Sequence, residues 1–342
     1  MEIRYLALSA PPAQLAQTAR VMEEVGFAGV DVAEANHDPF VSLTAAATAT
    51  HRLGLRTAVA VAFARNPMNV AMLAHDLQTL SGGRFQLGLG TQLSAHIIKR
   101  FSMPWSQPVS RMREFVQALH AIWDAFEGEG SLRYRGQIYR HTLMVPFFNP
   151  GPSGLPRPPV MLGGVGERMT QLAGEVADGF LCHNISSPLF LKEVTLPALE
   201  RGRESAGRTM EGFRLHVSPM VATGSDEEQL AASKERIRAQ LAFYTATPSY
   251  AKLLELHGLS EMGAELQRLA MRGRTADMAA AVDDSALNTL AFVGEPQDVA
   301  RRLHESYGGV VDSMSFYEPV VTDPRHWLTI MDELRRLDAV PV

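Results

Sequence analysis

The hydrophobic pattern of this chain switches repeatedly between two periods, and residues 67–90 show the switch clearly. In the first part, apolar residues recur every three or four positions, which predicts a helix. These residues are Val70, Leu73, Leu77 and Leu80. After Gly82-Gly83, which ends the helix, Phe85, Leu87 and Leu89 alternate with polar or small residues and predict a strand. One helix followed by one strand is the repeating unit of an α/β fold.

The same unit recurs along the chain. Predicted helices follow most of the predicted strands, and residues 67–80 form one of them. The others cover Ala13–Val25, Asp38–Thr50, Ser110–Phe126, Arg168–Ala177 and Trp327–Leu337. Eight strands are predicted, at Ile3–Ser9, Gly29–Glu34, Leu55–Phe63, Phe85–Leu89, Val160–Leu162, Gly179–His183, Phe213–Val221 and Asp312–Phe316. Eight strands that alternate with helices predict an α/β fold of the (β/α)8 TIM-barrel class.

Two regions interrupt the alternation. After the fourth strand, Thr91–Pro108 predicts a long loop, 132–143 a short hairpin and 144–159 an irregular proline-rich connection. Between the seventh and eighth strands, residues 226–307 predict a mostly helical insertion, because this stretch is too long for one crossover helix. We therefore expect one barrel domain over residues 1–342, with insertions after strand 4 and between strands 7 and 8.

Composition restricts the class of protein further. The chain has 342 residues, a formal net charge of −5 and one cysteine, Cys182. The negative charge argues against nucleic acid as a partner. A single cysteine suits a reducing compartment, and there is no apolar run long enough to span a bilayer. With no secretory signal visible at the N-terminus, we expect a cytoplasmic protein that binds a small molecule and no membrane.

Several candidate site residues follow predicted strands, and the carboxyl ends of the strands form the working face of a barrel. Glu34 and His37 follow the second strand and could form a proton-transfer pair. The alternative for Glu34 is a salt bridge, and Asp38 is expected to cap the next helix. His183 ends the sixth strand, so we expect it to face the site. No histidine or cysteine has companions at the spacing of a metal site, so no metal is expected.

Glycines mark two further positions. Gly163-Gly164-Val165-Gly166 lies at a strand-to-helix turn, where backbone N–H groups and the helix N-terminus could bind a phosphate. The alternative is a tight turn with no ligand. Gly88 and Gly90 remove side chains near the end of the fourth strand, where the backbone could approach a flat ligand.

Motifs in the same order resemble the luciferase-like monooxygenase superfamily. They are the NP…LSGGR…LGLG run at 66–90, AEANHDPF at 33–40, RFSMPW at 100–105, YRHTLMVPFFNPGP at 139–152, GEVADGF at 174–180 and VDSMSFYEP at 311–319. The closest branch is that of the oxidoreductases dependent on coenzyme F420, a deazaflavin. The resemblance implies hydride transfer at the barrel mouth and a homodimer formed through helices, with Met68, Met72 and Leu73 as candidate surface.

The resemblance also implies site residues. Thr57-Ala58 would form a bulge, with a non-proline cis peptide, that supports the face of the cofactor ring. His96 falls where relatives place a ring-contacting Asn. The implied cofactor-binding residues are Thr57, Ala58, Gly90, Gln92, His96, Leu162, Gly163, Gly164 and Val165. The candidate catalytic residues are Glu34, His37, His96 and His183, and the pKa values of the three histidines are expected to suit neutral pH.

Two positions depart from the family pattern and leave alternatives open. Ala35 stands where some sugar-phosphate dehydrogenases of this branch have a catalytic histidine, and Leu93 stands where some relatives have a proton-donating Glu. An FMN-dependent monooxygenase that uses oxygen and a reductase partner is one alternative. A non-catalytic flavin or deazaflavin binder is another. A lyase or isomerase barrel is a third, although no lysine for Schiff-base chemistry lies on a predicted strand.

Overall fold

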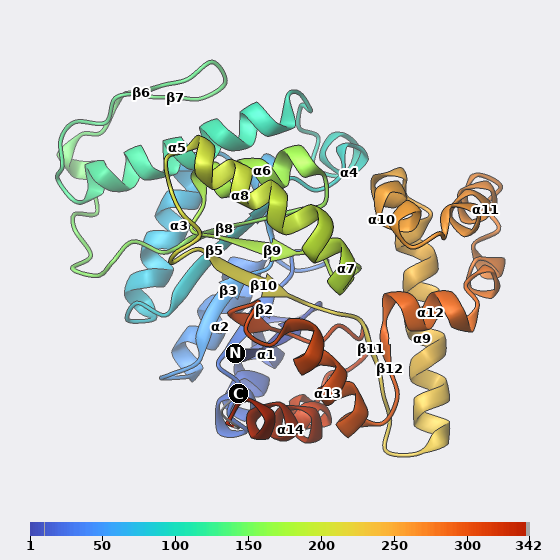
Figure 1. The fold of residues 1–342 in the computed structure, drawn as a ribbon. Coiled ribbons are helices and arrows are strands. Elements are labelled where there is room, and N and C mark those ends of the chain that lie inside the picture. Colours follow the sequence, from blue (N-terminus) through green and yellow to red (C-terminus); the bar gives the residue numbers. More distant parts are fainter. Residues whose placement is uncertain (10, 340–342) are drawn as a thin grey trace. The chain divides into compact units, whose positions relative to one another are not determined.

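The computed structural model describes residues 1–9 and 11–339 (Figure 1). Its contacts divide the chain into two compact units. The first unit comprises Ala7–Leu181 and Ala198–Arg214, and the second comprises 1–6, 182–197 and the chain from Leu215 onward. Each unit is described by itself. The expectation of a single domain over 1–342 stays a prediction.

The eight predicted strands are all present among the described residues, and the (β/α)8 barrel class is confirmed. They are β1 (Glu2–Ala7), β2 (Gly29–Val32), β3 (Gly54–Thr57), β5 (Phe85–Gly90), β8 (Val160–Gly164), β9 (Gly179–Cys182), β10 (Arg214–Val217) and β13 (Ser313–Met314). In the first unit, β2, β3, β5 and β8 pair in that order, and every pairing is parallel. In the second unit, β13 pairs in parallel with both β1 and β10.

The predicted helices of the first unit are also confirmed. They are α1 (Pro12–Glu24), α2 (Pro39–Ala49), α3 (Pro67–Leu80), α5 (Pro108–Phe126) and α6 (Glu167–Val176). The helix α8 (Leu196–Ser205) follows a π-helical turn, Leu191–Thr195, and neither was predicted. Capping residues explain two of the helix starts, because the side chain of Asp38 accepts hydrogen bonds from Phe40 and Val41 and that of Asn66 accepts one from Asn69.

The core of the first unit lies where α3 and α5 cover the sheet. Phe115, Leu119 and Ile122 on α5 are fully buried, as are Leu87 and Leu89 on β5. The indole of Trp123 donates a hydrogen bond to the carbonyl of Ala71, 3.1 Å away, and so joins α5 to α3. The apolar stripe predicted along α5 therefore packs inward, as its helical spacing requires.

The insertion after β5 differs in part from the prediction. The expected loop from Thr91 to Pro108 contains a short helix, α4 (Ser94–Lys99). The predicted hairpin is confirmed as β6 (Tyr134–Arg135) and β7 (Arg140–His141), and Figure 1 shows it extending beyond α5. Its turn is held because the carboxylate of Glu114 accepts N–H bonds from three consecutive residues, Gln137, Ile138 and Tyr139.

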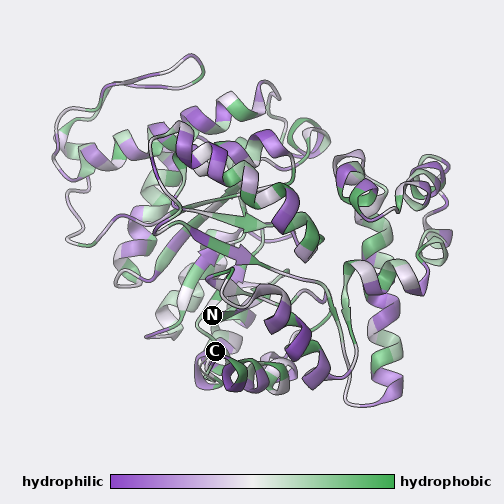
Figure 2. Ribbon diagram, viewed as in Figure 1, coloured by the Kyte–Doolittle hydropathy of each residue, from purple (hydrophilic) through white to green (hydrophobic). Residues whose placement is uncertain are grey.

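The second unit is mostly helical, as predicted for residues 226–307. Its helices are α7 (Pro188–Phe190), α9 (Glu227–Thr245), α10 (Ala251–Leu256), α11 (Ser260–Met271), α12 (Asp284–Leu290), α13 (Pro296–Tyr307) and α14 (Leu328–Asp338). Two short strands, β11 (Val221–Ala222) and β12 (Phe292–Val293), pair in parallel inside this region. Figure 2 shows hydrophobic and hydrophilic residues alternating along α14, as in a helix with one face buried. Over the described part of the chain, no helix is both long and apolar enough to cross a membrane.

Candidate active site

The third barrel strand breaks where the sequence predicted a bulge, but the cis peptide lies one residue later than predicted. It joins Ala58 to Val59, not Thr57 to Ala58. The chain then forms a two-residue strand, β4 (Ala60–Val61), and a 3₁₀ turn, η1 (Ala62–Ala64). The prediction at Thr57-Ala58 was wrong because it was set by counting back from Pro67, which cannot identify the last residue of β3 still bound to the sheet.

Thr57 is that residue. Its hydroxyl donates to the carbonyl of Gly88 at 2.7 Å and accepts the N–H of Gly88 at 2.9 Å, so it pairs with β5 through its side chain. Thr57 is fully buried. The structure therefore shows Thr57 as a support for the bulge, whereas its contact with a cofactor stays a prediction.

The glycines of β5 and β8 make room for this bulge. A Cβ on Gly88 would lie 1.9 Å from the carbonyl oxygen of Thr57. A Cβ on Gly90 would lie 2.5 Å from one methyl of Val59, and a Cβ on Gly163 would lie 2.9 Å from the other. The bulge thus takes the side-chain space that these glycines leave open. The predicted approach of the backbone at Gly88 and Gly90 to a flat ligand stays a prediction. Ala58 and Val59 are partly exposed, so they form the accessible face at this point.

The second glycine segment forms the predicted turn between β8 and α6. Leu162 is buried, whereas Gly163, Gly164 and Val165 are partly exposed. Gly166 is the N-cap of α6, its φ is −79°, and no side chain caps the helix there. A Cβ at Gly166 would meet nothing within 4 Å. The first N–H groups of a helix lack intrahelical partners, so this end of α6 is open to an anion.

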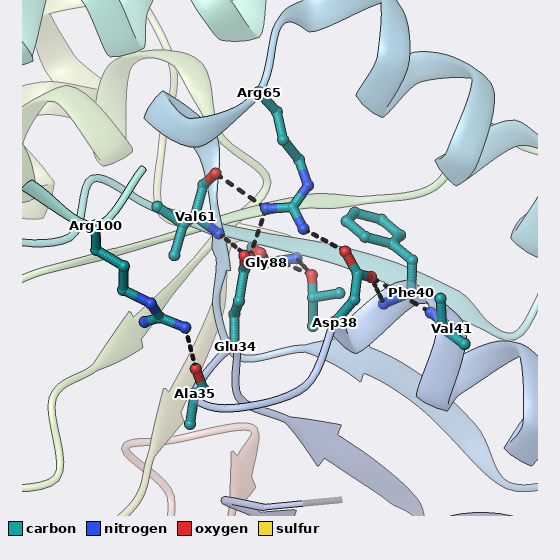
Figure 3. Close-up of polar contacts among 10 residues, drawn as sticks. Glu34, Ala35, Asp38, Phe40, Val41, Val61, Arg65, Gly88 and Arg100 are labelled. Carbon is teal, nitrogen blue, oxygen red and sulfur yellow. Dashed lines mark hydrogen bonds and ion pairs between the residues drawn. The ribbon is translucent and has the colours of Figure 1, made fainter. Parts of the chain in front are cut away.

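A charged cluster follows β2, and it consists of Glu34, Asp38 and Arg65 (Figure 3). The guanidinium of Arg65 binds Glu34 and Asp38 at 2.6 Å each. Glu34 also accepts the N–H of Val61 at 2.7 Å. Burial opposes the charge on Arg65, but its bonds to both carboxylates outweigh this effect and raise its pKa. The structure thus shows the salt bridge that was the alternative for Glu34 and the helix cap expected for Asp38.

The other predicted groups near this cluster lie on loops and on α4. His37 is partly exposed and His96 is exposed. Among the described residues, neither imidazole has a hydrogen-bond partner. Gln92 adopts a positive φ of 59°, and its side chain accepts the N–H of Leu93 at 2.9 Å. The guanidinium of Arg100 donates to the carbonyl of Ala35, which ties the end of α4 to the loop after β2 (Figure 3).

His183 belongs to a different environment in the second unit. Its Nε2 lies 3.0 Å from the hydroxyl of Tyr250, and its ring packs edge-on against Tyr244 at a centroid distance of 4.9 Å. Burial lowers its pKa to about 4. The expectation of a pKa suited to neutral pH is therefore wrong for His183, because aromatic rings surround the imidazole and no carboxylate offsets the loss of water.

The sequence did not identify three of the polar residues around His183. Tyr244 lies in the last turn of α9, Tyr250 lies in a 3₁₀ turn, η4 (Pro248–Tyr250), and Tyr317 follows β13. The hydroxyls of Tyr244 and Tyr317 are 3.2 Å apart. The first two lie in the helical insertion, where no motif or strand end marks them, so only the folded chain reveals them.

Two other features limit the chemistry. The Cys182 thiol is buried, which raises its pKa to about 12, so it is not a nucleophile at neutral pH. Within residues 1–9 and 11–339, no three His, Cys, Asp or Glu side chains are grouped so that they could hold a metal ion.

Comparisons with known proteins show the family and the fold. The sequence model of the family described as luciferase-like monooxygenase matches residues 3–313. An uncharacterized protein of Mycobacterium tuberculosis is 48% identical over 300 residues, 88% of each chain. A putative coenzyme F420-dependent oxidoreductase of the same organism is 27% identical over 318 residues, 86% of this chain and 87% of that protein. The solved coenzyme F420-dependent tetrahydromethanopterin reductase of Methanopyrus kandleri has a TM-score of 0.80 at 21% identity, over 96% of both chains. That likeness shows a shared fold.

Proposed function

The chain belongs to the luciferase-like monooxygenase family, and from this premise we propose that it is an oxidoreductase that uses coenzyme F420. The coenzyme would serve hydride transfer to or from a small organic substrate at the C-terminal mouth of the barrel. Relatives that are named as dependent on coenzyme F420 support this choice of cofactor over FMN. At the level of the family, they also support an enzyme over a non-catalytic binder.

One observation of the structure carries the proposal. Gly163 packs so closely on Val59 that a Cβ would lie 2.9 Å from its methyl group. The bulge and the glycine turn are therefore neighbours, and the open end of α6 follows the turn directly. A flat ring needs an apolar supporting face, which Ala58 and Val59 offer. A phosphodiester needs N–H donors, which the start of α6 offers. These residues fit a flat, phosphate-bearing cofactor.

The residues of this chain then take separate roles. When bound, coenzyme F420 supplies the ring carbon that gives or takes the hydride. Ala58 and Val59 would support the ring, and Gly163 to Gly166 would bind the phosphate. His37 and His96 remain the candidates for moving a proton, because their imidazoles are not engaged within the described chain. Glu34 would act indirectly, since it holds Arg65 and the N–H of Val61 after the bulge.

The test is a pair of fluorescence titrations with coenzyme F420 and with FMN. The proposal expects coenzyme F420 to bind with a Kd in the micromolar range or below and FMN to bind at least about tenfold more weakly, a difference of about 1.4 kcal/mol. The reverse preference would move the chain to the flavin-dependent monooxygenases and direct the search to oxygen uptake and a reductase. If neither cofactor bound, the proposed cofactor site would be wrong.

A pair of variants at Gly166 locates the phosphate. Gly166→Asp and Gly166→Asn both introduce a good N-cap at a position with ordinary φ and free space, so both should leave α6 folded. Only the aspartate places a negative charge beside the bound phosphate. We expect Gly166→Asp to weaken coenzyme F420 binding by about tenfold or more relative to Gly166→Asn. Equal affinities would place the phosphate elsewhere.

We also propose a homodimer formed through α3. Met72 is 48% and Leu73 38% exposed on this helix, and Met68 is partly exposed beside them. Exposed apolar side chains that lie next to one another often mark a surface that another protein covers. Light scattering at micromolar concentration should give twice the chain mass, and a monomer would overturn this part of the proposal.

A further inference from the structure

Five polar and aromatic residues of the second unit form one hydrogen-bonded group, here called the tyrosine–histidine cluster. It consists of His183, Asn184, Tyr244, Tyr250 and Tyr317. Asn184 donates to the hydroxyl of Tyr244 at 3.4 Å, and the hydroxyls of Tyr244 and Tyr317 are 3.2 Å apart. His183 and Asn184 follow β9, and Tyr317 follows β13. In (β/α)8 enzymes, the residues after the strands carry the substrate-binding groups.

The hydrogen bonds of His183 determine the direction of the donor at Tyr250. The backbone N–H of Ile185 donates to Nδ1 of His183 at 3.4 Å. In a neutral imidazole, the other nitrogen must then carry the hydrogen, so Nε2 donates to the hydroxyl oxygen of Tyr250. The hydroxyl hydrogen of Tyr250 is left without an acceptor among the described residues. Tyr250 is 8% exposed, and its hydroxyl hydrogen is available to water or to a ligand that reaches the cluster.

A second donor arises in the same way. Of the Tyr244 and Tyr317 hydroxyls, only one can donate to the other. The amide nitrogen of Asn184 donates to Tyr244, and among the described contacts neither hydroxyl donates to the amide oxygen of Asn184. Among the residues that the structure describes, one hydroxyl hydrogen of the pair therefore has no acceptor. The rings of Tyr244 and Tyr250 lie 6.1 Å apart between centroids, so two phenol donors belong to one small region.

The cluster carries no charge at neutral pH. Burial lowers the pKa of His183 to about 4, and burial raises the pKa values of Tyr250 and Tyr317 far above the neutral range. In the described chain, no lysine or arginine side chain hydrogen-bonds to any of the five residues. A site with neutral donors and aromatic walls favours a neutral acceptor, since a bound anion would lose its hydration without gaining a counter-charge.

We propose that the tyrosine–histidine cluster binds the oxygen atom of a neutral carbonyl or alcohol compound, with Tyr250 and the Tyr244–Tyr317 pair as donors. This inference deepens the proposed function, on which it rests, by naming the substrate class. His183 acts as a positioning residue, because it fixes the oxygen of Tyr250 and thereby the direction of its O–H bond. Phosphorylated and carboxylated substrates are disfavoured by the same cluster. His183, Asn184 and Tyr244 are partly exposed and give access to it.

The test compares three ring compounds of similar size by calorimetry on the folded protein. The probes are cyclohexanone, cyclohexanecarboxylate and methylenecyclohexane, which lacks the oxygen. We expect cyclohexanone to bind about tenfold more tightly than either of the others. A preference for the carboxylate, or no binding of cyclohexanone at millimolar concentration, would overturn the proposal.

Variants then assign the effect to the cluster. Tyr250→Phe and the double variant Tyr244→Phe/Tyr317→Phe each remove one unused hydroxyl donor and should each reduce the preference for cyclohexanone over methylenecyclohexane by about fivefold to tenfold. Tyr134→Phe is the matched control, because its hydroxyl bonds Gln117 on α5 at 3.2 Å and the change should leave the preference unaltered. An unaltered preference in both cluster variants would overturn the proposal.

Coenzyme F420 titration of the same variants separates the two proposals. Unchanged coenzyme affinity with lost ketone preference supports both. A protein that prefers the ketone but binds no coenzyme would contradict the proposed function and support the substrate class assigned to the cluster.

Discussion

Two groups of polar residues follow barrel strands in this chain, and they differ in charge and in how their hydrogen bonds are satisfied. In the charged cluster after β2, one guanidinium is bound to two carboxylates at 2.6 Å each. In the tyrosine–histidine cluster after β9 and β13, every member is neutral, and two hydroxyl hydrogens have no acceptor within the described part of the chain. In the first group, the opposite charges of the protein's own side chains are paired. The second group has hydroxyl donors that a ligand could use.

This difference separates structural from ligand-binding candidates. Glu34 looked catalytic in the sequence because an acid follows a barrel strand, but its carboxylate holds Arg65 and the backbone after the bulge. Tyr250 had no signal in the sequence, yet its hydroxyl is the one that a ligand could satisfy. The ion pair of Glu34 with Arg65 therefore indicates a structural role. The hydroxyl of Tyr250, whose hydrogen has no acceptor among the described residues, indicates a candidate ligand site.

The largest change in stability is expected when the charged cluster is broken. Arg65→Ala leaves Glu34 almost buried and without its counter-charge, so we expect the free energy of unfolding to fall by about 3–4 kcal/mol in urea titrations. Arg157→Ala is the control, because Arg157 and its partner Asp124 are both exposed, and we expect a loss below about 1 kcal/mol. Equal losses in the two variants would show that the charged cluster has no special role in stability.

The second prediction uses the neutrality of His183. Its pKa is lowered to about 4 in the folded protein, so between pH 6.5 and pH 4 the unfolded chain takes up a proton that the folded chain does not. The stability from this group is present above pH 6.5 and is lost as the pH falls. Its loss reaches about 3 kcal/mol below pH 4, at about 1.4 kcal/mol for each pKa unit.

Unfolding of the wild type and of His183→Gln at pH 7, 5.5 and 4 measures this loss. The wild type should lose more stability than the variant as the pH falls, and His51→Gln, at an exposed position, should follow the wild type. Parallel pH profiles for the wild type and His183→Gln would show that His183 is not desolvated in solution.

The smallest effect concerns the hydroxyls of the second cluster. Tyr244→Phe removes the hydrogen bond that Asn184 donates to the hydroxyl and the hydrogen bond between the hydroxyls of Tyr244 and Tyr317. We therefore expect the free energy of unfolding to fall by about 1 kcal/mol. Tyr134→Phe, which removes a more exposed hydroxyl, should change stability by less than about 0.5 kcal/mol. A loss above about 3 kcal/mol for Tyr244→Phe would mean that the hydroxyl is essential to the fold and not held in reserve.

The fold was predictable from the sequence because its information is local. The period of apolar residues gave α3 and β5 within a residue of their ends, since burial on one face requires that spacing. The helix α4 was missed because its six residues carry no apolar repeat long enough to recognise.

The site was less predictable because it depends on contacts between distant residues. The glycine turn before α6 was visible as a motif, but the cis peptide was misplaced by one residue, since only the pairing of Thr57 with Gly88 fixes the end of β3. Glu34 and Arg65 are 31 residues apart, and Tyr250 is 67 residues from His183. No local pattern connects such pairs.

The most direct test of the central claim is hydride transfer itself. Reduced coenzyme F420 would be mixed with the protein and cyclohexanone, and the return of oxidised deazaflavin fluorescence would be followed with the protein as the only variable. The account predicts protein-dependent oxidation of the coenzyme with formation of cyclohexanol in equal amount. Tight coenzyme binding without oxidation by cyclohexanone or by any ketone, aldehyde or enone of a wider panel would contradict it and identify the chain as a non-catalytic deazaflavin binder.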